Sequence, residues 1–304
     1  MIKAITVTNY IGESLTMELA SPENSRGFII KEITGLGPSK ATISTTALAT
    51  TDGAVFNGAR LEPRNIVLTL DLSRAADAEE LRQLTYKYFP IKKFLTFGVE
   101  TNQRKLEAYG YVESNEPNIF SSGETAQISI VCPDPYFYSA SGKNVTVFSG
   151  VSPMFEFPFS NESLSKDLIE MGAITHRQEN VVVYNGDASV GVTITIHAIG
   201  NDVKNITIYN SRTREMMKVN TDLIETMTGT PFGTGDDIII CTKRGMKSVT
   251  LFRAGTTTNI LNALARDSSW FQLSKGDNMF AYDCEEGALN VQFKIENDVI
   301  YEGV

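Results

Sequence analysis

The sequence has very little of the residue types that enzyme sites and metal sites most often require. It contains two histidines, three cysteines and one tryptophan in 304 residues. The cysteines, Cys132, Cys241 and Cys284, are far apart and odd in number, and no C-x-x-C pair occurs, which argues against a disulfide framework and against a zinc site. We therefore expect reduced thiols, no metal and no cofactor.

Sequence signals of catalysis and of membrane insertion are also missing. The nucleophile pattern G-x-S-x-G, the zinc pattern H-E-x-x-H and the phosphate-loop pattern G-x-x-x-x-G-K-[ST] do not occur. No apolar run is long enough to cross a bilayer, and residues 1–8 alternate like a strand instead of resembling a signal peptide. The sequence therefore predicts a protein that is not an enzyme and is not inserted in a membrane.

The charge is acidic and unevenly distributed. The net charge is −9. Residues 1–150 hold 14 Lys and Arg against 16 Asp and Glu, a net charge of −2, whereas residues 151–304 hold 13 against 20, a net charge of −7. A clamp for nucleic acid needs a basic face that displaces phosphate counterions. Sequence-specific nucleic-acid binding is therefore not expected.

The N-terminal half is predicted to be mainly β and crossed by one helix. Residues 64–72 alternate between apolar and polar side chains, which is typical of a half-buried strand. The helix is expected near residues 77–89, because Asp77 is a good N-cap, Glu80 completes a capping box and Pro90 stops the pattern.

The C-terminal half is predicted to be almost purely β. Residues 192–199 alternate cleanly, and several further short strands are separated by turns such as Gly233–Asp237. A short helix or 3₁₀ turn is expected only near residues 259–265. Short strands with regular turn signals favour a β-sandwich.

A stiff corner divides the two halves. Pro133 and Pro135 lack a donor N–H and restrict the residues before them, so a central strand cannot continue through them. We predict a domain junction at Pro133, Asp134, Pro135 and Tyr136. The expected domains are residues 1–138 and 150–304, with residues 139–149 as a linker and first strand of the second domain.

Few residues remain as candidates for chemistry. His197 lies on the less buried face of its predicted strand, and no partner for it can be identified. The Gly233–Asp237 segment lacks the lysine of a phosphate loop, which favours a hairpin turn. Two acidic clusters, Asp236 with Asp237 and Asp283 with Glu285 and Glu286, could bind Ca²⁺, but they match no EF-hand spacing, so solvated turns are favoured.

Trp270 supports an alternative function. Alternation places Trp270 and Gln272 on one face, with Phe271 and Leu273 on the other. Packing in a core or an interface is the favoured role. An exposed Trp270 would instead be a candidate for stacking on a sugar, in a carbohydrate-binding module that recognises host surface glycans.

The order of several motifs resembles the siphophage distal tail protein family, Dit. In the first half these motifs are Ile33-Thr34-Gly35-Leu36-Gly37-Pro38, Thr51-Asp52-Gly53-Ala54, Arg64-Asn65-Ile66 and Cys132-Pro133-Asp134-Pro135-Tyr136. In the second half they are Asn185-Gly186-Asp187, Val219-Asn220, Thr258-Asn259-Ile260-Leu261 and Ser274-Lys275-Gly276-Asp277-Asn278.

The resemblance implies a structural virion protein, a hexameric hub at the distal tip of a siphophage tail. Its N-terminal domains, β-sandwich or barrel-like, would form a ring. Its C-terminal domains would be galectin-like or carbohydrate-module-like β-sandwiches. Implied partners are other copies of the chain, the tail tube protein and a tail-associated hub or receptor-binding protein. The implied location is the virion tail tip, after synthesis in the host bacterial cytoplasm.

Overall fold

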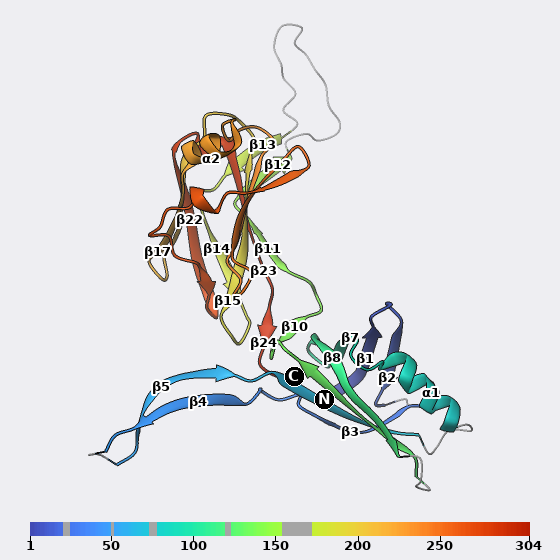
Figure 1. Cartoon of the computed structure of the whole chain (residues 1–304). Coiled ribbons are helices and arrows are strands. Elements are labelled where there is room, and N and C mark those ends of the chain that lie inside the picture. The colour runs from blue at the N-terminus through green and yellow to red at the C-terminus, as the bar shows by residue number, and fades with distance from the viewer. Residues whose placement is uncertain (21–24, 50–51, 73–77, 119–122, 154–171) are drawn as a thin grey trace, which may run out of the picture. The chain divides into compact units, whose positions relative to one another are not determined.

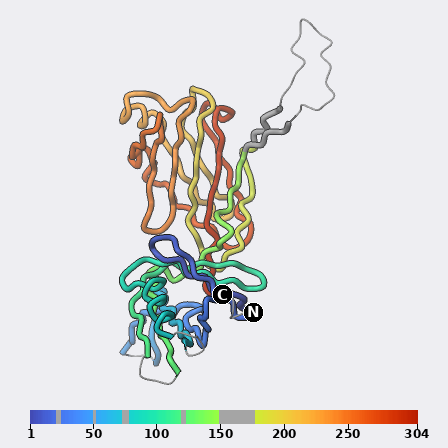
Figure 2. The backbone as a smooth tube through the Cα atoms, turned by 90° about the vertical axis from the view of Figure 1, so that its right-hand side faces the viewer, coloured from blue at the N-terminus to red at the C-terminus, as the bar shows by residue number. Residues whose placement is uncertain are grey.

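The chain divides into two compact units in a computed structural model that describes residues 1–20, 25–49, 52–72, 78–118, 123–153 and 172–304. The first unit holds Met1–Gly142 together with Ile300–Val304, and the second holds Lys143–Val299. In sequence, the second unit is thus inserted into the first. Both chain termini belong to the first unit, where they lie side by side (Figures 1 and 2).

The first unit is built on one antiparallel sheet of nine strands. Seven strands follow the order β2–β1–β7–β8–β9–β6–β3, and β10 pairs with both β8 and β24. Strands β4 and β5 form a separate two-stranded ribbon (Figure 1). The bounds are β1 Ile2–Asn9, β2 Ser14–Glu18, β3 Ile29–Thr34, β4 Ala41–Ala47, β5 Ala54–Leu61, β6 Arg64–Asp71, β7 Phe94–Thr101, β8 Lys105–Asn118, β9 Thr125–Cys132, β10 Phe137–Ser139 and β24 Ile300–Tyr301.

The core of the first unit lies on one face of this sheet. In β6, Ile66, Leu68 and Leu70 are fully buried, in agreement with the predicted alternation. Burying each such side chain stabilises the fold by roughly 1.5–3 kcal/mol. Helix α1, Ala78–Tyr88, packs on the same core through Leu81 and Tyr88. The predicted helix is therefore confirmed, whereas its predicted N-cap, Asp77, lies outside the described residues.

Strand β24 corrects one predicted boundary. Residues 300–304 were expected in the second domain, but Ile300 pairs with Tyr138 and Tyr301 pairs with Phe137. Ile300 is buried there, and Val304 N–H donates to the carbonyl of Leu36. Pairing over so long a separation leaves no local signal in the sequence.

The second unit contains two antiparallel sheets that face each other. One has the order β11–β23–β15–β18–β19–β20, with β21 on β15, and the other has the order β14–β22–β16–β17. Tyr282 of β22 stacks on Phe293 of β23, with ring centroids 5.1 Å apart. The bounds are β11 Asn144–Val147, β14 Glu179–Tyr184, β15 Val190–Ala198, β16 Lys204–Asn210, β17 Glu215–Val219, β18 Asp237–Cys241, β19 Ser248–Arg253, β20 Thr256–Asn259, β21 Gln272–Leu273, β22 Gly276–Glu286 and β23 Val291–Asn297.

These elements confirm the mainly β class of the chain. The galectin-like or carbohydrate-module-like character of the second unit stays a prediction. A further pair of strands, β12 Ser149–Pro153 and β13 Gly172–His176, forms its own two-stranded sheet.

One helix of the second unit was not predicted from the sequence. Helix α2, Thr221–Thr228, begins after Asn220, whose side chain accepts from the N–H groups of Asp222 and Leu223. It ends at Gly229, which has a left-handed φ of 77°. An Asn at the N-cap and a Gly at the C-terminal end are sequence features that predict a helix between them. The expected helical turn near 259–265 is present as η2, Leu261–Ala263, and a second 3₁₀ turn, η3, spans Ala288–Asn290.

In the part of the chain that the structure describes, no helix combines the length and apolarity needed to span a bilayer.

Candidate assembly surfaces and the domain junction

The predicted junction residues form a turn within the first unit. Asp134 organises it: one carboxylate oxygen accepts from the N–H of Tyr136 at 3.1 Å and the other from the hydroxyl of Tyr138 at 2.5 Å. The chain then continues as β10, which still belongs to the first unit. Asp134 and the two prolines therefore shape the turn into β10, and the first unit itself ends at Gly142.

Arg64 ties this turn to two distant segments. Its Nε donates to the carbonyl of Pro135 at 2.8 Å, and its Nη1 donates to the carbonyls of Gly35 and Gly37 at 2.6 and 2.5 Å. Its Nη2 donates to the carbonyl of Glu302 at 2.6 Å. The guanidinium also lies over the ring of a buried aromatic side chain, Phe137, 4.3 Å from the centroid. We call Arg64 with these acceptors the Arg64 clasp.

In the Arg64 clasp, backbone carbonyl oxygens accept the hydrogen bonds of the guanidinium, in the place that a carboxylate takes in an ion pair. Arg64 is buried, and burial lowers the pKa of its guanidinium, although the neighbouring Cys132 and Asp134 act in the opposite direction. Burial also disfavours the charged form of the neighbouring Cys132 thiol, and so it raises the pKa of that thiol to about 11. Gly35 makes the close approach possible, because a Cβ there would lie 2.0 Å from the carbonyl oxygen of Asn65 and its φ is +83°.

The β4–β5 ribbon has one apolar face that nothing covers in the described structure. Ile43 pairs with Ala59, and Thr45 pairs with Phe56, so these side chains share a face. Ile43 and Phe56 are 62% and 63% exposed. The face consists of Ala41, Ile43, Thr45, Ala47, Ala54, Phe56, Ala59 and Leu61, and we call it the ribbon face.

The opposite side of the ribbon is polar except for Val55. The Asn57 side chain donates to the Thr46 hydroxyl at 2.6 Å, and the Thr42 hydroxyl donates to Glu62 at 2.6 Å. The ribbon is thus amphipathic although both of its sides meet solvent. In the sequence this segment shows only a Thr- and Ala-rich stretch at residues 41–51. A register shift between Ser44 and Thr45 breaks the strict alternation that would have revealed the apolar face.

A second exposed apolar surface lies on the outer side of the first unit's sheet. Phe94 on β7 pairs with Tyr111 on β8, and the ring of Phe94 lies 5.9 Å from that of Tyr111 and 6.2 Å from that of Tyr109. The three side chains are 37–49% exposed. We call Phe94, Tyr109 and Tyr111 the aromatic row.

The second unit exposes an apolar stripe on the sheet that contains β22. Val181 pairs with Met279, and Tyr209 pairs with Met216 on the same outward face. All four side chains are at least one-third exposed. Methionine and tyrosine are enriched in protein interfaces.

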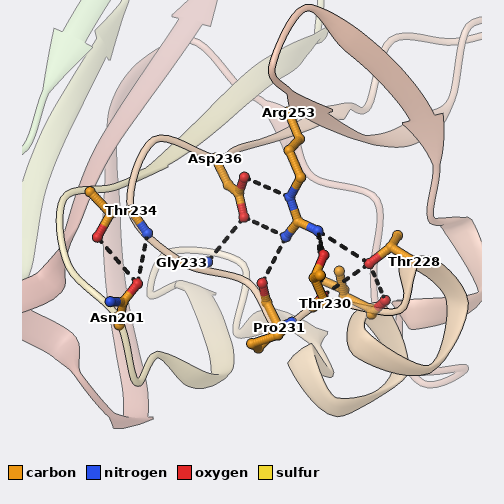
Figure 3. A network of polar contacts seen from close by, with 9 residues as sticks. Asn201, Thr228, Thr230, Pro231, Gly233, Thr234, Asp236 and Arg253 are labelled. Atoms are coloured by element: carbon orange, nitrogen blue, oxygen red, sulfur yellow. Dashed lines mark hydrogen bonds and ion pairs between the residues drawn. The ribbon is translucent and has the colours of Figure 1, made fainter.

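The predicted turn at Gly233–Asp237 is confirmed, and a polar network holds it (Figure 3). Asp236 accepts from the Gly233 N–H at 3.0 Å, from Arg253 Nε at 2.8 Å and from Arg253 Nη2 at 2.5 Å. Burial would raise the pKa of Asp236, but the bonds from Arg253 and Gly233 outweigh it and hold that pKa below its usual value. Arg253 also donates to Thr230 and Pro231. This arrangement binds the turn to the segment after α2 and engages both carboxylate oxygens of Asp236.

The candidate residues for chemistry have structural partners. His197 lies on a partly exposed sheet face as predicted, and its Nδ1 is 2.8 Å from Asp237 on the neighbouring strand. This partner was missed because cross-strand register cannot be read from one sequence. Glu285 contacts Lys218 at 2.9 Å, and Glu286 contacts Lys204 at 2.8 Å. Within the described ranges, no group of three or more His, Cys, Asp or Glu side chains is placed to hold a metal ion.

Trp270 is half-buried beside two buried neighbours. Phe271 and Leu273 are buried, as the alternation predicted. The ammonium group of Lys247 lies 5.2 Å from the centroid of the Trp270 ring. A sugar stacked on that side of the ring would meet the lysine, and a glycan-stacking role for Trp270 stays a prediction.

One family model and several solved structures are similar to this chain. Residues 185–296 match the family model of the siphovirus-type tail component, C-terminal domain. The fold is similar to that of Dit, gp 19.1, of phage SPP1, with a TM-score of 0.64 and 14% identity over 98% of this chain and 99% of that chain. A chain of the phage P2 baseplate in its activated conformation with Ca matches with a TM-score of 0.47 and 9% identity over 100% of both chains.

No curated protein sequence matches this chain. The resemblance to the siphophage distal tail protein family, indicated by the order of the sequence motifs, is confirmed by the family model over residues 185–296 and by a Dit fold that extends over nearly the whole chain.

Proposed function

We propose that this chain is a structural protein of a siphophage tail, the hub that joins the tail tube to the tail-tip or receptor-binding apparatus. The family model and the Dit fold support this role. The similar SPP1 protein is described as a paradigm of the hub adsorption apparatus in phages that infect Gram-positive bacteria. The chain would be made in the bacterial cytoplasm, would become part of the virion and would act through its surfaces, without enzymatic activity.

The observation that carries a self-assembling hub is the uncovered ribbon face. A two-stranded ribbon is at best marginally stable in water, yet β4 and β5 pair only with each other among the described strands. Removing Ile43 and Phe56 from water would contribute roughly 1.5–3 kcal/mol for each side chain. A second copy of the chain that covers this face would stabilise both the ribbon and the assembly.

A ring is the natural product of such a contact. If a surface on one copy binds a different surface on the next, the contact is heterologous, and it closes into a ring when the rotation fits. From the family resemblance we expect that ring to be a hexamer. The apolar stripe with Val181, Tyr209 and Met279 would remain available for the tail tube protein or the receptor-binding protein.

The test is the mass of the full chain in solution by native mass spectrometry and light scattering. A hexamer would have about six times the chain mass of 33.4 kDa. Phe56→Lys should shift the protein to monomer, because it places a charge on the ribbon face. Val55→Lys is the matched control, since Val55 is the neighbouring exposed residue on the opposite side of the ribbon. Equal effects of the two variants, or a wild-type monomer at every concentration, would contradict self-assembly through this face.

A further inference from the structure

We infer that strand β20 of the second unit binds an extended segment of a partner protein, which adds to its sheet as a further strand. β20, Thr256–Asn259, is the last strand of its sheet and pairs only with β19 among the described strands. All four of its residues are exposed. The site lies in the second unit and does not involve the ribbon face, so this inference and the proposed ring can fail independently.

The register of β20 shows which of its backbone groups are available. The N–H of Ile260 donates to the carbonyl of Val249 at 2.9 Å, and hydrogen-bonded pairs alternate with non-hydrogen-bonded pairs in an antiparallel ladder. The N–H and carbonyl groups of Thr257 and Asn259 therefore point away from β19. In the part of the chain that the structure describes, no other backbone group pairs with them. Such a row of donors and acceptors is a template for another strand.

The edge of β20 lacks the devices that usually prevent such pairing, which are charge, proline, a bulge or a cover. The edge strands β2, β3, β14 and β17 each contain a charged residue. The edge strand β11 has none, but the Asn180 side chain donates to the carbonyl of Val147 there. β20 has the sequence Thr-Thr-Thr-Asn and pairs with β19 without a register shift.

A pocket beside β20 would hold a side chain of the added strand. It has a volume of about 380 Å³, and residues of β19, of β20 and of the C-terminal end of α2 line it. Among them are the buried Leu251 and the exposed Met227. Thr258 pairs with Leu251, so a residue opposite Thr258 in an added strand would point its side chain to the side of this pocket. The volume suits one large aliphatic or aromatic side chain.

The two walls of the pocket are already connected. Arg253 of β19 donates to the hydroxyl of Thr228, the last residue of α2, at 3.4 Å, and the network around Asp236 fixes its guanidinium (Figure 3). A pocket that is formed before binding spares the partner the cost of ordering it.

Charge favours a basic partner segment. Asp236 neutralises Arg253, and the last turn of α2 carries no basic residue. The C-terminal end of α2 therefore keeps its partial negative charge beside the pocket. Residues 151–304 also have a net charge of −7. We expect a segment with alternating apolar residues and a Lys or Arg next to them.

The β20 strand of a second copy fits less well. Two β20 edges that paired with each other would bring threonine to each pocket, and threonine offers it little apolar surface. Their contact would also be two-fold, and a two-fold contact closes as a dimer.

The probes are fluorescein-labelled peptides, Lys-Thr-X-Thr-X-Thr-Lys, in which X is Val, Leu, Met or Phe. Each is titrated into the full chain and followed by fluorescence anisotropy. We expect at least one of them to bind, and its version with X as Ser to bind more weakly by about tenfold or more. Hydrogen exchange should slow at the amides of Thr257 and Asn259 and stay unchanged at Thr256 and Thr258, whose N–H groups already pair with β19.

Thr257→Pro removes the outward N–H at a position where an edge strand tolerates proline. It should weaken binding by about fivefold or more. Thr257→Ala is the matched control, because it keeps the N–H, and it should bind like the wild type. The exchange pattern of the wild-type chain tests the same contact without any substitution.

Three results would overturn the inference: no binding by any of the four peptides, equal binding by Thr257→Pro, or protection that spares Thr257 and Asn259. A wild-type dimer that Thr257→Pro dissociates would also overturn it, since the edge would then belong to a second copy.

Discussion

Arg64 donates a hydrogen bond to the carbonyl oxygen of Glu302, a residue 238 positions further along the chain, at 2.6 Å. The same guanidinium binds the turn at Gly35–Gly37 and the turn at Pro135. The first unit is therefore completed only when the last residues of the chain return to it. This dependence determines how the two units can be separated experimentally.

A first unit without the second should fold only if β24 is kept. Because Tyr138 pairs with Ile300, Ser139 and Val299 can be joined by a two-residue Asn-Gly turn. This minimal unit should unfold cooperatively, whereas residues 1–142 alone should be less stable by about 3 kcal/mol, since Ile300 and the Glu302 acceptor are missing. Urea unfolding followed by circular dichroism measures the difference. Equal stability of the two proteins would show that β24 contributes little.

Loss of the Arg64 side chain should destabilise the first unit strongly. Arg64→Met keeps much of the volume but leaves the carbonyls of Gly35, Gly37, Pro135 and Glu302 without this donor. The expected loss is about 3 kcal/mol, because unsatisfied buried polar groups are costly. Arg60→Met, at an exposed arginine on the ribbon, should change stability by less than about 0.5 kcal/mol. Both can be measured in the minimal unit, and a loss as small as that of Arg60→Met would argue against the clasp.

The buried thiols should be inert at moderately alkaline pH. Burial raises the pKa of Cys132 to about 11 and that of Cys284 to about 12, while Cys241 is partly exposed. Ellman's reagent at pH 8 should therefore label Cys241 alone, and all three thiols in denaturant. The Cys241→Ser variant should show no rapid labelling.

The same shifts fix the sign of a pH effect. The raised pKa values mean that the folded state keeps its thiol protons more tightly than the unfolded state, whose thiols have a pKa of roughly 8.5. The stability from Cys132 and Cys284 is complete below that value and is lost as the pH rises towards 11. Unfolding free energies measured between pH 8 and 10 should fall, and Cys132→Ala should reduce the slope.

The Asp236–Arg253 pair should make the second unit sensitive to acid. The pKa of Asp236 is lowered, so its contribution is complete above the unfolded value of roughly 3.9 and is lost as the pH falls through the lower folded value. Asp236→Asn should cost about 2 kcal/mol at pH 7, since it leaves Arg253 without its carboxylate. It should also flatten the loss of stability between pH 5 and 3. Glu286→Gln, in an exposed pair with Lys204, should change little.

Much of the fold could be predicted from local patterns in the sequence. The alternation of residues 64–72 and 192–199, the helix before Pro90 and the turn at Gly233–Asp237 depend on near neighbours, and each is present in the structure. Helix α2 could also have been predicted, because Asn220 and Gly229 mark its two ends.

The long-range strand pairings and the exposed apolar surfaces could not be predicted from one sequence. The pairing of Tyr138 with Ile300 and of His197 with Asp237 is a matter of long-range register. In the sequence, the segment around Tyr109 and Tyr111 shows ordinary strand alternation. The two tyrosines could equally face a core. Only the fold reveals that Ala108 and Val112 take the core side and leave the tyrosines in solvent.

The insertion of the second unit between β10 and β24 also has a mechanical consequence. Since these strands are paired, the chain leaves the first unit and returns to it at neighbouring strands, which lie about 5 Å apart. A force that is transmitted through the first unit does not pass through the second unit. Such a force therefore does not pull the two ends of the second unit apart. A pull on the second unit reaches the first unit along two covalent connections, which share the load.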